Sequence, residues 1–212
     1  CIITKTLSLL EIKKNTKLKI DIIKNIPVQG GLGSASSNAA ALIIALEDMN
    51  LIDIKKPAYY STLGADIPSF LFRKDCLVTG IGEKIKYFAF PKYFFLLVKP
   101  KFNNSTKKMY KKLNFVNDIS DQILLLENKE IDEKDVGNDF ENIVMKESGE
   151  FIKIFKFLEN LDESIFTRMT GSGSCCYVAF EKKNHAINGL KQFKLEFPEL
   201  WSIVCENNYI DN

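Results

Sequence analysis

The chain has 212 residues and a formal net charge of +2 at pH 7, and 46% of its residues are hydrophobic. This fraction is ordinary for a globular protein, and the length accommodates one large domain or two small ones. Basic and acidic residues are mixed along the sequence, which argues against a nucleic-acid-binding protein but not against a local site for one small anion. No apolar run reaches the roughly 18 to 20 residues that a membrane-spanning helix needs.

The cysteines and the single histidine point to no metal site. The chain has five cysteines without a metal-binding spacing: Cys1, Cys76, Cys175, Cys176 and Cys205. Adjacent Cys175 and Cys176 would point to opposite faces of a strand, so a bridge between them would strain the backbone. This pattern favours a reducing, cytoplasm-like compartment. His185 lies in a polar run and is expected at the surface, which weakens any mechanism that needs a histidine base.

The first part of the chain predicts a strand, a loop, two helices and a hairpin. Alternating polar and apolar residues predict a strand at 17–23. An Ala- and Leu-rich run that begins at Ser36 predicts a helix, and a second helix is expected at 58–63. Residues 77–80 and 83–87 flank a Gly-Ile-Gly turn, which predicts a hairpin.

The second part predicts alternating helices and strands. A continuous apolar strand at 94–98 follows the domain boundary, so we expect domains at 1–93 and 94–212. Helical patterns occur near 106–113, 119–128, 138–148, 151–160 and 184–197. Further strands are expected at 175–180 and 201–205. The layout predicts an α+β fold.

A glycine- and serine-rich loop at 27–37 is the strongest functional signal. Glycines let main-chain N–H groups approach a ligand, and the helix that follows adds its positive N-terminal end. The pattern favours phosphate binding over a turn that serves packing only, although it lacks the Walker lysine and the Rossmann spacing. The candidate nucleotide-binding residues of this loop are Pro27, Val28, Gln29, Gly30, Gly31, Leu32, Gly33, Ser34, Ala35, Ser36 and Ser37.

The loop resembles the nucleotide loop of the galactokinase, homoserine kinase, mevalonate kinase and phosphomevalonate kinase superfamily. Within it, Leu-Gly-Ala-Asp-Ile-Pro at 63–68 resembles the Leu-Gly-Ala-Asp-Val-Pro stretch of the 4-diphosphocytidyl-2-C-methyl-D-erythritol kinases. Weaker similarities are Gly-Ile-Gly-Glu at 80–83, Asn138-Asp139 followed by Glu141, and Met-Thr-Gly-Ser-Gly-Ser at 169–174. The resemblance extends from about Lys17 to the C-terminus.

The resemblance implies a two-lobed GHMP-type kinase fold with the active site in the cleft between the lobes. It implies transfer of the ATP γ-phosphoryl group, with Mg²⁺, to the 2-hydroxyl of a small-molecule substrate, 4-diphosphocytidyl-2-C-methyl-D-erythritol, in the non-mevalonate isoprenoid pathway. The alternatives are another acceptor within the superfamily or a catalytically impaired nucleotide-binding remnant. We expect no nucleic-acid or membrane partner, and a location in the cytoplasm or a plastid-like stroma. The sequence assigns neither an oligomeric state nor metal ligands, for which Ser34, Ser36 and Ser37 are candidates only.

Three sets of residues receive site roles from the resemblance. Asp66 is the expected catalytic base, because a carboxylate can accept the proton of the attacking hydroxyl; by spacing alone, an aspartate in a polar turn is equally acceptable. A second amide cradle is expected at Gly171, Ser172, Gly173 and Ser174, with a tight turn as the alternative. Thr106 and Tyr110 lie where the family contacts the cytidine, with an aromatic of the helical core as the alternative for Tyr110.

Two motifs favour structural roles instead. Asn138 as N-cap and Glu141 three residues later predict a capping box at the start of a helix. The Gly-Ile-Gly-Glu motif at 80–83 is expected to be the hairpin turn rather than a ligand contact.

The sequence departs from the family at its beginning and in the loop. The family's Pro-Ala-Lys-Ile-Asn-Leu-like strand, whose lysine lies beside the catalytic aspartate, and its Asp-Gly-Tyr-His-like segment have no counterpart before Lys17. The chain opens with Cys1, so we expect an N-terminally incomplete fragment with little kinase activity by itself and an unpaired edge at 17–23. Ser34-Ala35 replaces the family's usual Gly-Gly.

Overall fold

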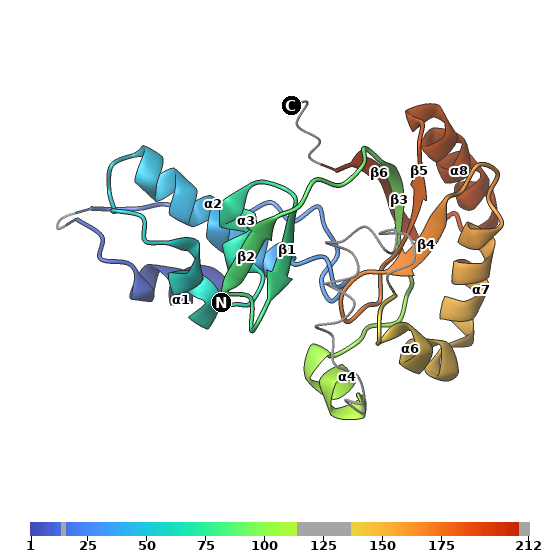
Figure 1. The fold of residues 1–212 in the computed structure, drawn as a ribbon, viewed down its shortest axis with the longest axis horizontal. Helices are drawn as coiled ribbons and strands as arrows, with labels where there is room; N and C mark the ends of the chain where they lie inside the picture. The colour runs from blue at the N-terminus through green and yellow to red at the C-terminus, as the bar shows by residue number, and fades with distance from the viewer. Residues whose placement is uncertain (14–15, 114–136, 208–212) are drawn as a thin grey trace. The chain divides into compact units, whose positions relative to one another are not determined.

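A computed structural model describes residues 1–13, 16–113 and 137–207, which divide into two compact units. Unit 1 consists of Cys1–Ile26 and Gly33–Ala89, and unit 2 of Pro27–Leu32 and Phe90–Asn212 (Figure 1). The first part of the glycine-rich loop, which we expected in the first domain, therefore groups with the second unit. The domain boundary between residues 93 and 94 stays a prediction.

Unit 1 is a small helical layer with one hairpin. Its elements are α1 (Ile2–Leu9), α2 (Ser34–Asp48), the 3-10 helix η1 (Pro57–Thr62), α3 (Ile67–Phe72), β1 (Cys76–Thr79) and β2 (Lys84–Tyr87). Ala39, Ile43 and Leu46 are buried at helical spacing along α2, which gives that helix one apolar face. This face packs with Tyr60 and Ile67 in the core of the unit.

The structure confirms the helix at α2 and the hairpin, in which Leu77 pairs with Lys86. The helix expected at 58–63 is a 3-10 helix. The helix α1 was not predicted. Neither was α3, where the proline at the second position is tolerated because the first-turn N–H groups have no partner within the helix.

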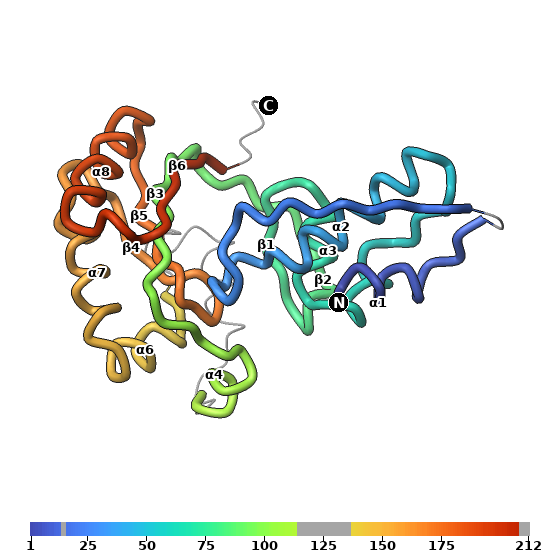
Figure 2. The backbone as a smooth tube through the Cα atoms, turned by 180° about the vertical axis from the view of Figure 1, so that it is seen from behind, coloured from blue at the N-terminus to red at the C-terminus, as the bar shows by residue number. Residues whose placement is uncertain are grey.

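The strand predicted at 17–23 is wrong. The segment runs extended through unit 1, as the blue tube in Figure 2 shows, but it joins no ladder among the described residues. Its alternating apolar side chains remain exposed, at 38% for Leu18, 38% for Ile20 and 44% for Ile22. A strand needs hydrogen bonds to a neighbouring strand, and no described segment supplies them, which agrees with the unpaired edge expected at 17–23.

Unit 2 is a four-stranded antiparallel sheet covered by helices. Its strands are β3 (Phe94–Lys99), β4 (Phe166–Met169), β5 (Cys176–Phe180) and β6 (Trp201–Glu206), in the order β4-β5-β3-β6. Its described helices are α4 (Thr106–Lys112), α6 (Glu141–Glu147), α7 (Gly149–Glu159) and α8 (Lys183–Glu196). Figure 1 shows α7 and α8 on one face of the sheet. The order β3-α7-β4-β5-α8-β6 is a split βαβ arrangement of the ferredoxin-like kind.

The core of unit 2 lies between this sheet and the helices α7 and α8. Alternate residues of the two central strands are fully buried, among them Leu96 and Val98 of β3 and Val178 and Phe180 of β5. The helix α8 approaches closely because Gly189 has no side chain: a Cβ there would lie 3.1 Å from the ring of Phe180.

Most predicted elements of this unit are confirmed within a few residues, while β4 was not predicted. The helix expected at 119–128 lies outside the described residues. All five cysteines are free thiols. Within the described ranges, no helix combines the length and the apolar character that crossing a membrane requires.

The core assignment can be tested by truncation on α8. Phe193 is fully buried, so Phe193→Ala should lower the free energy of unfolding by about 3 to 5 kcal/mol through lost burial and a residual cavity. Leu195 lies two residues further on the same helix and is 85% exposed, so Leu195→Ala should change stability by less than about 0.5 kcal/mol. Urea unfolding of both variants measures the difference, and equal effects would contradict this core.

Candidate functional site

Asp66 presents a carboxylate that the local fold does not use. The residue is the N-cap of α3, yet its side chain makes no capping hydrogen bond. The main-chain carbonyl of Asp66 instead accepts hydrogen bonds from Ser69 Oγ at 2.8 Å and from the N–H of Phe70 at 3.3 Å. The carboxylate is exposed, and no described residue donates a hydrogen bond to it. The turn is thus held by the main chain of Asp66, and its acid group is available to a ligand.

The N-terminus of α2 lies beside this carboxylate within unit 1. Gly33 is the N-cap of α2 with φ +61°, and a Cβ there would lie 3.0 Å from the ring of Phe70 and 3.4 Å from Asp66 Oδ2. Glycine is therefore required both by the left-handed backbone and by the close approach of α3. A negative group and a helix N-terminus are brought together at this point.

The first turn of α2 offers unused hydrogen-bond donors. The main-chain N–H of Ser37 is bonded to Gly33 O at 2.9 Å, whereas no described residue accepts from the N–H groups of Ser34, Ala35 or Ser36. These amides and the dipole of a 15-residue helix form an arrangement that attracts anions. The hydroxyl of Ser37 is engaged, because it donates to Ser34 O at 3.1 Å.

The hairpin turn at 80–83 supports the segment that carries Asp66. Gly82 has φ +103°, and a Cβ there would overlap the carbonyl oxygen of Ala65 and lie 2.8 Å from its Cα. Hydrogen bonds from the main-chain N–H groups of Glu83 itself and of Ile81 hold the pKa of Glu83 below its usual range. The hairpin turn expected at this motif is confirmed, and in addition its second glycine permits contact with the residue before Asp66.

In unit 2, the loop Pro27–Leu32 is hydrogen-bonded to the second glycine-rich loop. Gly30 O accepts from Thr170 Oγ1 at 2.6 Å and from the N–H of Cys175 at 3.0 Å, and Gln29 O accepts from the N–H of Ser174 at 3.4 Å. The second loop is closed by a bond from the N–H of Gly173 to Thr170 O at 2.7 Å. Two segments about 140 residues apart therefore form one structure.

Packing accounts for two of the glycines in this loop. A Cβ on Gly31 would overlap Thr170 O, and a Cβ on Gly30 would lie 2.5 Å from Cys175 Sγ. Burial raises the pKa of the Cys175 thiol to about 12, so this side chain stays neutral beneath the loop. The packing interpretation that the sequence left open therefore applies to Gly30 and Gly31, and it does not exclude ligand contact by their main chain.

The second loop has both engaged and unengaged groups. No described residue accepts a hydrogen bond from the N–H of Gly171 or of Ser172, so both amides can bind an anion. Ser174 is fully buried and its hydroxyl donates to Phe102 O at 2.7 Å. Its side chain is thus structural, although we expected it among the nucleotide-binding residues. Ser172 Oγ lies 2.9 Å from Thr106 Oγ1, which links this loop to α4.

A buried lysine, which the sequence analysis missed, binds the segment whose Phe102 carbonyl accepts the hydrogen bond from Ser174. Lys99 is 8% exposed, and its Nζ donates to Pro100 O, Phe102 O and Asn103 Oδ1 at 2.8, 2.7 and 3.0 Å. Burial lowers the pKa of Lys99. The sequence analysis assigns no role to Lys99, which directly follows the strand expected at 94–98.

Tyr110 lies on α4 as predicted but is not a core residue. Its side chain is 53% exposed, and its ring contacts Phe140 edge to face with centroids 5.1 Å apart. Among the described residues, no three His, Cys, Asp or Glu side chains are grouped as metal ligands.

The capping box predicted at 138–141 is wrong. Asn138 Oδ1 accepts from the N–H of Phe140 at 2.9 Å, which closes a short side-chain turn before α6. Its Nδ2 donates to Met169 O and Gly171 O, both at 2.8 Å. Glu141 Oε1 accepts from the N–H of Met169 at 2.6 Å rather than from the N–H of Asn138. The two side chains therefore bind the end of β4 and the second loop, through the N–H and the carbonyl of Met169 and the carbonyl of Gly171.

Comparison with protein families gives two matches. The N-terminal domain of the GHMP kinases matches residues 2–73, and the C-terminal domain of the GHMP kinases matches residues 122–199. Together these matches cover more than half of the chain.

Two similar proteins are named 4-diphosphocytidyl-2-C-methyl-D-erythritol kinase. The protein from Francisella tularensis subsp. tularensis (strain FSC 198) is 36% identical over 168 residues, which are 78% of this chain and 58% of that protein. The protein from Neisseria gonorrhoeae (strain NCCP11945) is 32% identical over 184 residues, or 82% of this chain and 61% of that protein. The chain thus spans about three fifths of the length of these relatives.

Solved structures agree with these matches. A crystal structure of 4-(cytidine 5'-diphospho)-2C-methyl-D-erythritol kinase superposes with a TM-score of 0.69 at 25% identity, covering 86% of this chain and 67% of that one. Methanococcus jannaschii mevalonate kinase gives a TM-score of 0.66 at 17% identity, covering all of this chain and 74% of that one. The latter likeness concerns the fold alone.

The support that Gly82 gives to the Asp66 segment predicts unequal effects of two alanine substitutions. Gly82→Ala should displace Ala65 and change the amide chemical shift of Asp66, because the new Cβ overlaps main-chain atoms that cannot move independently. Gly80→Ala serves as the control: it also has a positive φ of +71°, but its Cβ would meet only the end of the Glu83 side chain.

Both substitutions should cost about 1 kcal/mol for the left-handed backbone, and Gly82→Ala should cost more. Two-dimensional NMR and thermal unfolding measure these effects. An Asp66 amide that shifts equally in both variants would show that the hairpin does not position this segment.

Proposed function

The chain belongs to the GHMP kinases, and on that premise we propose that the full-length protein transfers the γ-phosphoryl group of ATP to the 2-hydroxyl of 4-diphosphocytidyl-2-C-methyl-D-erythritol. The observation that carries this proposal is the unpaired, exposed carboxylate of Asp66 beside the N-terminus of α2. The names and sequence similarity of the two relatives support the choice of substrate.

Unused main-chain amides are the groups that we assign to the phosphates of ATP. They are the N–H groups of Ser34, Ala35 and Ser36 in the first turn of α2, and those of Gly171 and Ser172 in the second loop. Such amides stabilise charge on phosphate oxygens without reorganising during the reaction. The other residues of the loop at 27–37 and Gly173 shape the main chain around these donors.

Asp66 acts as the general base. As the new bond forms between the acceptor oxygen and the γ-phosphorus, the bond from that phosphorus to the bridging oxygen of ATP breaks, and ADP leaves. The proton of the acceptor hydroxyl passes to Asp66, whose carboxylate makes no hydrogen bond within the described chain. Positioning and charge stabilisation supply the larger part of the rate in phosphoryl transfer.

The residues present fit a Mg²⁺ ion that is held mainly by phosphates and water. The hydroxyls of Ser34 and Ser36 make no hydrogen bond with described residues and lie in the first turn of α2, whereas that of Ser37 is engaged. Mg²⁺ keeps several waters and commonly binds through substrate phosphates with few protein oxygens. When bound, it neutralises charge on the transferred phosphoryl group.

We assign the cytidine to Tyr110 and Thr106 on α4. The half-exposed ring of Tyr110 is fixed at one edge by Phe140, which leaves aromatic surface on which a base can stack. We also propose a cytoplasmic location, without a nucleic-acid or membrane partner.

Replacing Asp66 tests the catalytic assignment. Asp66→Asn keeps the size of the side chain but removes its basicity, so turnover should fall by about 10² to 10⁴ while the affinity for ATP stays nearly unchanged. A coupled ADP-release assay with a panel of acceptor alcohols measures turnover and selects the substrate. Asp53→Asn, at another exposed aspartate of unit 1, should have no effect. Full turnover by a folded Asp66→Asn variant would exclude the role.

Alanine substitutions at two glycines test the phosphate assignment. Gly33→Ala and Gly171→Ala place a Cβ on left-handed main chain, at φ +61° and +44°, next to the unused amides. Each should weaken ATP binding by about tenfold, or about 1.4 kcal/mol. Gly149→Ala is the control, because a Cβ there meets nothing within 4 Å. Calorimetry measures the affinities, and an unchanged affinity in either folded variant would remove that loop from the nucleotide site.

A further inference from the structure

We propose that the segment 138–141 is a positioning element, which fixes the second glycine-rich loop and the ring of Tyr110 in the arrangement that binds the two substrates. The proposal rests on the kinase function proposed above and adds residues to it. All of its contacts lie within unit 2. The sequence had indicated only a helix cap at this segment.

The side-chain amide of Asn138 donates both of its N–H groups to the second glycine-rich loop. Its Nδ2 donates to Met169 O and to Gly171 O, the carbonyls on either side of Thr170, each at 2.8 Å. Its Oδ1 is held by the N–H of Phe140 at 2.9 Å, so the orientation of the amide is fixed. A primary amide suits this position because its oxygen can accept a hydrogen bond from a nearby N–H while its nitrogen donates two hydrogen bonds to carbonyls of another segment.

The carboxylate of Glu141 also binds Met169. Its Oε1 accepts from the N–H of Met169, while the carbonyl of the same residue accepts from Asn138. Glu141 is partly buried, and desolvation raises its pKa, while the hydrogen bond from the N–H of Met169 and, to a smaller extent, the charge of Arg168 lower it. Among the interactions that lower this pKa, the hydrogen bond from Met169 is the largest, so it is the contact that most favours the ionised carboxylate.

Met169 is the residue against which the second glycine-rich loop packs. Met169 is 2% exposed, and its Sδ would lie 2.6 Å from a Cβ on Gly173, so its side chain lies directly against the loop. The next residue, Thr170, donates to Gly30 O. The amides of Gly171 and Ser172, assigned above to phosphate, follow immediately. A displacement of the main chain at Met169 would therefore move the phosphate donors.

The same segment also supports the residue that we assign to the base. Phe140, between Asn138 and Glu141, is 9% exposed and belongs to the core of unit 2. Its ring contacts that of Tyr110 edge to face. Thr106, one turn before Tyr110 on α4, lies 2.9 Å through its Oγ1 from Ser172 Oγ. The segment 138–141 thus reaches the phosphate loop with its polar side chains and the base-binding ring with its aromatic one.

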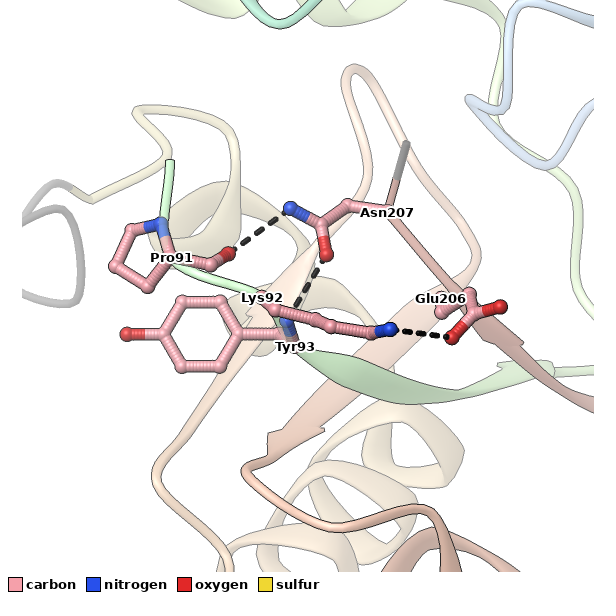
Figure 3. Close-up of polar contacts among 5 residues, drawn as sticks. All are labelled: Pro91, Lys92, Tyr93, Glu206 and Asn207. Carbon is pink, nitrogen blue, oxygen red and sulfur yellow. Dashed lines mark hydrogen bonds and ion pairs between the residues drawn. The ribbon is translucent and has the colours of Figure 1, made fainter. Parts of the chain in front are cut away.

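A purely structural role for Asn138 can be separated from positioning by a matched asparagine at the other end of the sheet. The side chain of Asn207 makes two main-chain contacts, compared with three for Asn138: its Nδ2 donates to Pro91 O and its Oδ1 accepts from the N–H of Tyr93, both at 2.9 Å (Figure 3). These lie beside Phe94, which pairs with Phe180, whereas Met169 pairs with Cys176 at the opposite end of β5.

The test compares Asn138→Ala, Glu141→Ala, Glu141→Gln and Asn207→Ala in the full-length protein. We expect the three alanine variants to lower the thermal midpoint by similar amounts. Only those at Asn138 and Glu141 should raise KM for ATP and KM for the cytidine substrate, by about tenfold, with a smaller effect on kcat. Glu141→Gln should restore both KM values, because its amide oxygen can still accept from Met169. If an alanine variant does not fold, Asn138→Asp keeps the bond to Phe140 but removes both donors.

The outcomes separate the two proposals. KM values that stay unchanged at Asn138 and Glu141, as at Asn207, would overturn the positioning role while leaving the kinase function in place. A wild-type protein that neither binds ATP in calorimetry nor releases ADP would overturn the kinase function itself. Failure of Glu141→Gln to restore KM would show that the Met169 contact is not the one that matters.

Discussion

Glycine permits a close approach at each part of the candidate site, either between two main-chain segments or between a main chain and a side chain. The loop Pro27–Leu32 can bond through Gly30 O to Thr170 and Cys175 only because no Cβ stands at Gly30 or Gly31. The carbonyls of Gln29, Gly30 and Thr170 accept hydrogen bonds within this loop structure, while the N–H groups of Gly171 and Ser172 have no acceptor among the described residues. An anion is the ligand that such a surplus of donors attracts.

The same constraint positions the acid group in unit 1. Gly33 admits the ring of Phe70 and the carboxylate of Asp66 beside the N-terminus of α2, and Gly82 admits Ala65. In unit 2 two side chains support the second loop. Asn138 donates two hydrogen bonds to it directly, and Lys99 donates three to the segment whose Phe102 carbonyl binds Ser174. Rigid support of this kind places amides accurately before a ligand arrives, which is how electrostatic stabilisation becomes effective.

Local patterns in the sequence predicted the glycine-rich loop, the helix α2 and the hairpin, and were compatible with a turn at Asp66, because each depends on neighbours a few residues away. The segment 17–23 forms no strand because strand pairing depends on a distant partner, which alternation alone does not reveal; its lack of a pairing partner among the described residues was expected. The capping box predicted at Asn138 was wrong for the same reason. Its partner Met169 is 31 residues away, and the local Asn-x-x-Glu spacing fits a helix cap equally well. The roles of Ser174 and Lys99 likewise depend on Phe102, which no spacing rule connects to both.

We propose for this GHMP kinase the phosphorylation, with ATP, of one hydroxyl of a cytidine-linked sugar alcohol. Phosphorus NMR of the full-length protein with ATP, Mg²⁺ and 4-diphosphocytidyl-2-C-methyl-D-erythritol tests it most directly. The account predicts one new phosphomonoester resonance, with a phosphorus–carbon coupling to C2 of the methylerythritol, that grows in step with ADP. Release of inorganic phosphate without that resonance, or phosphorylation at another hydroxyl, would contradict it.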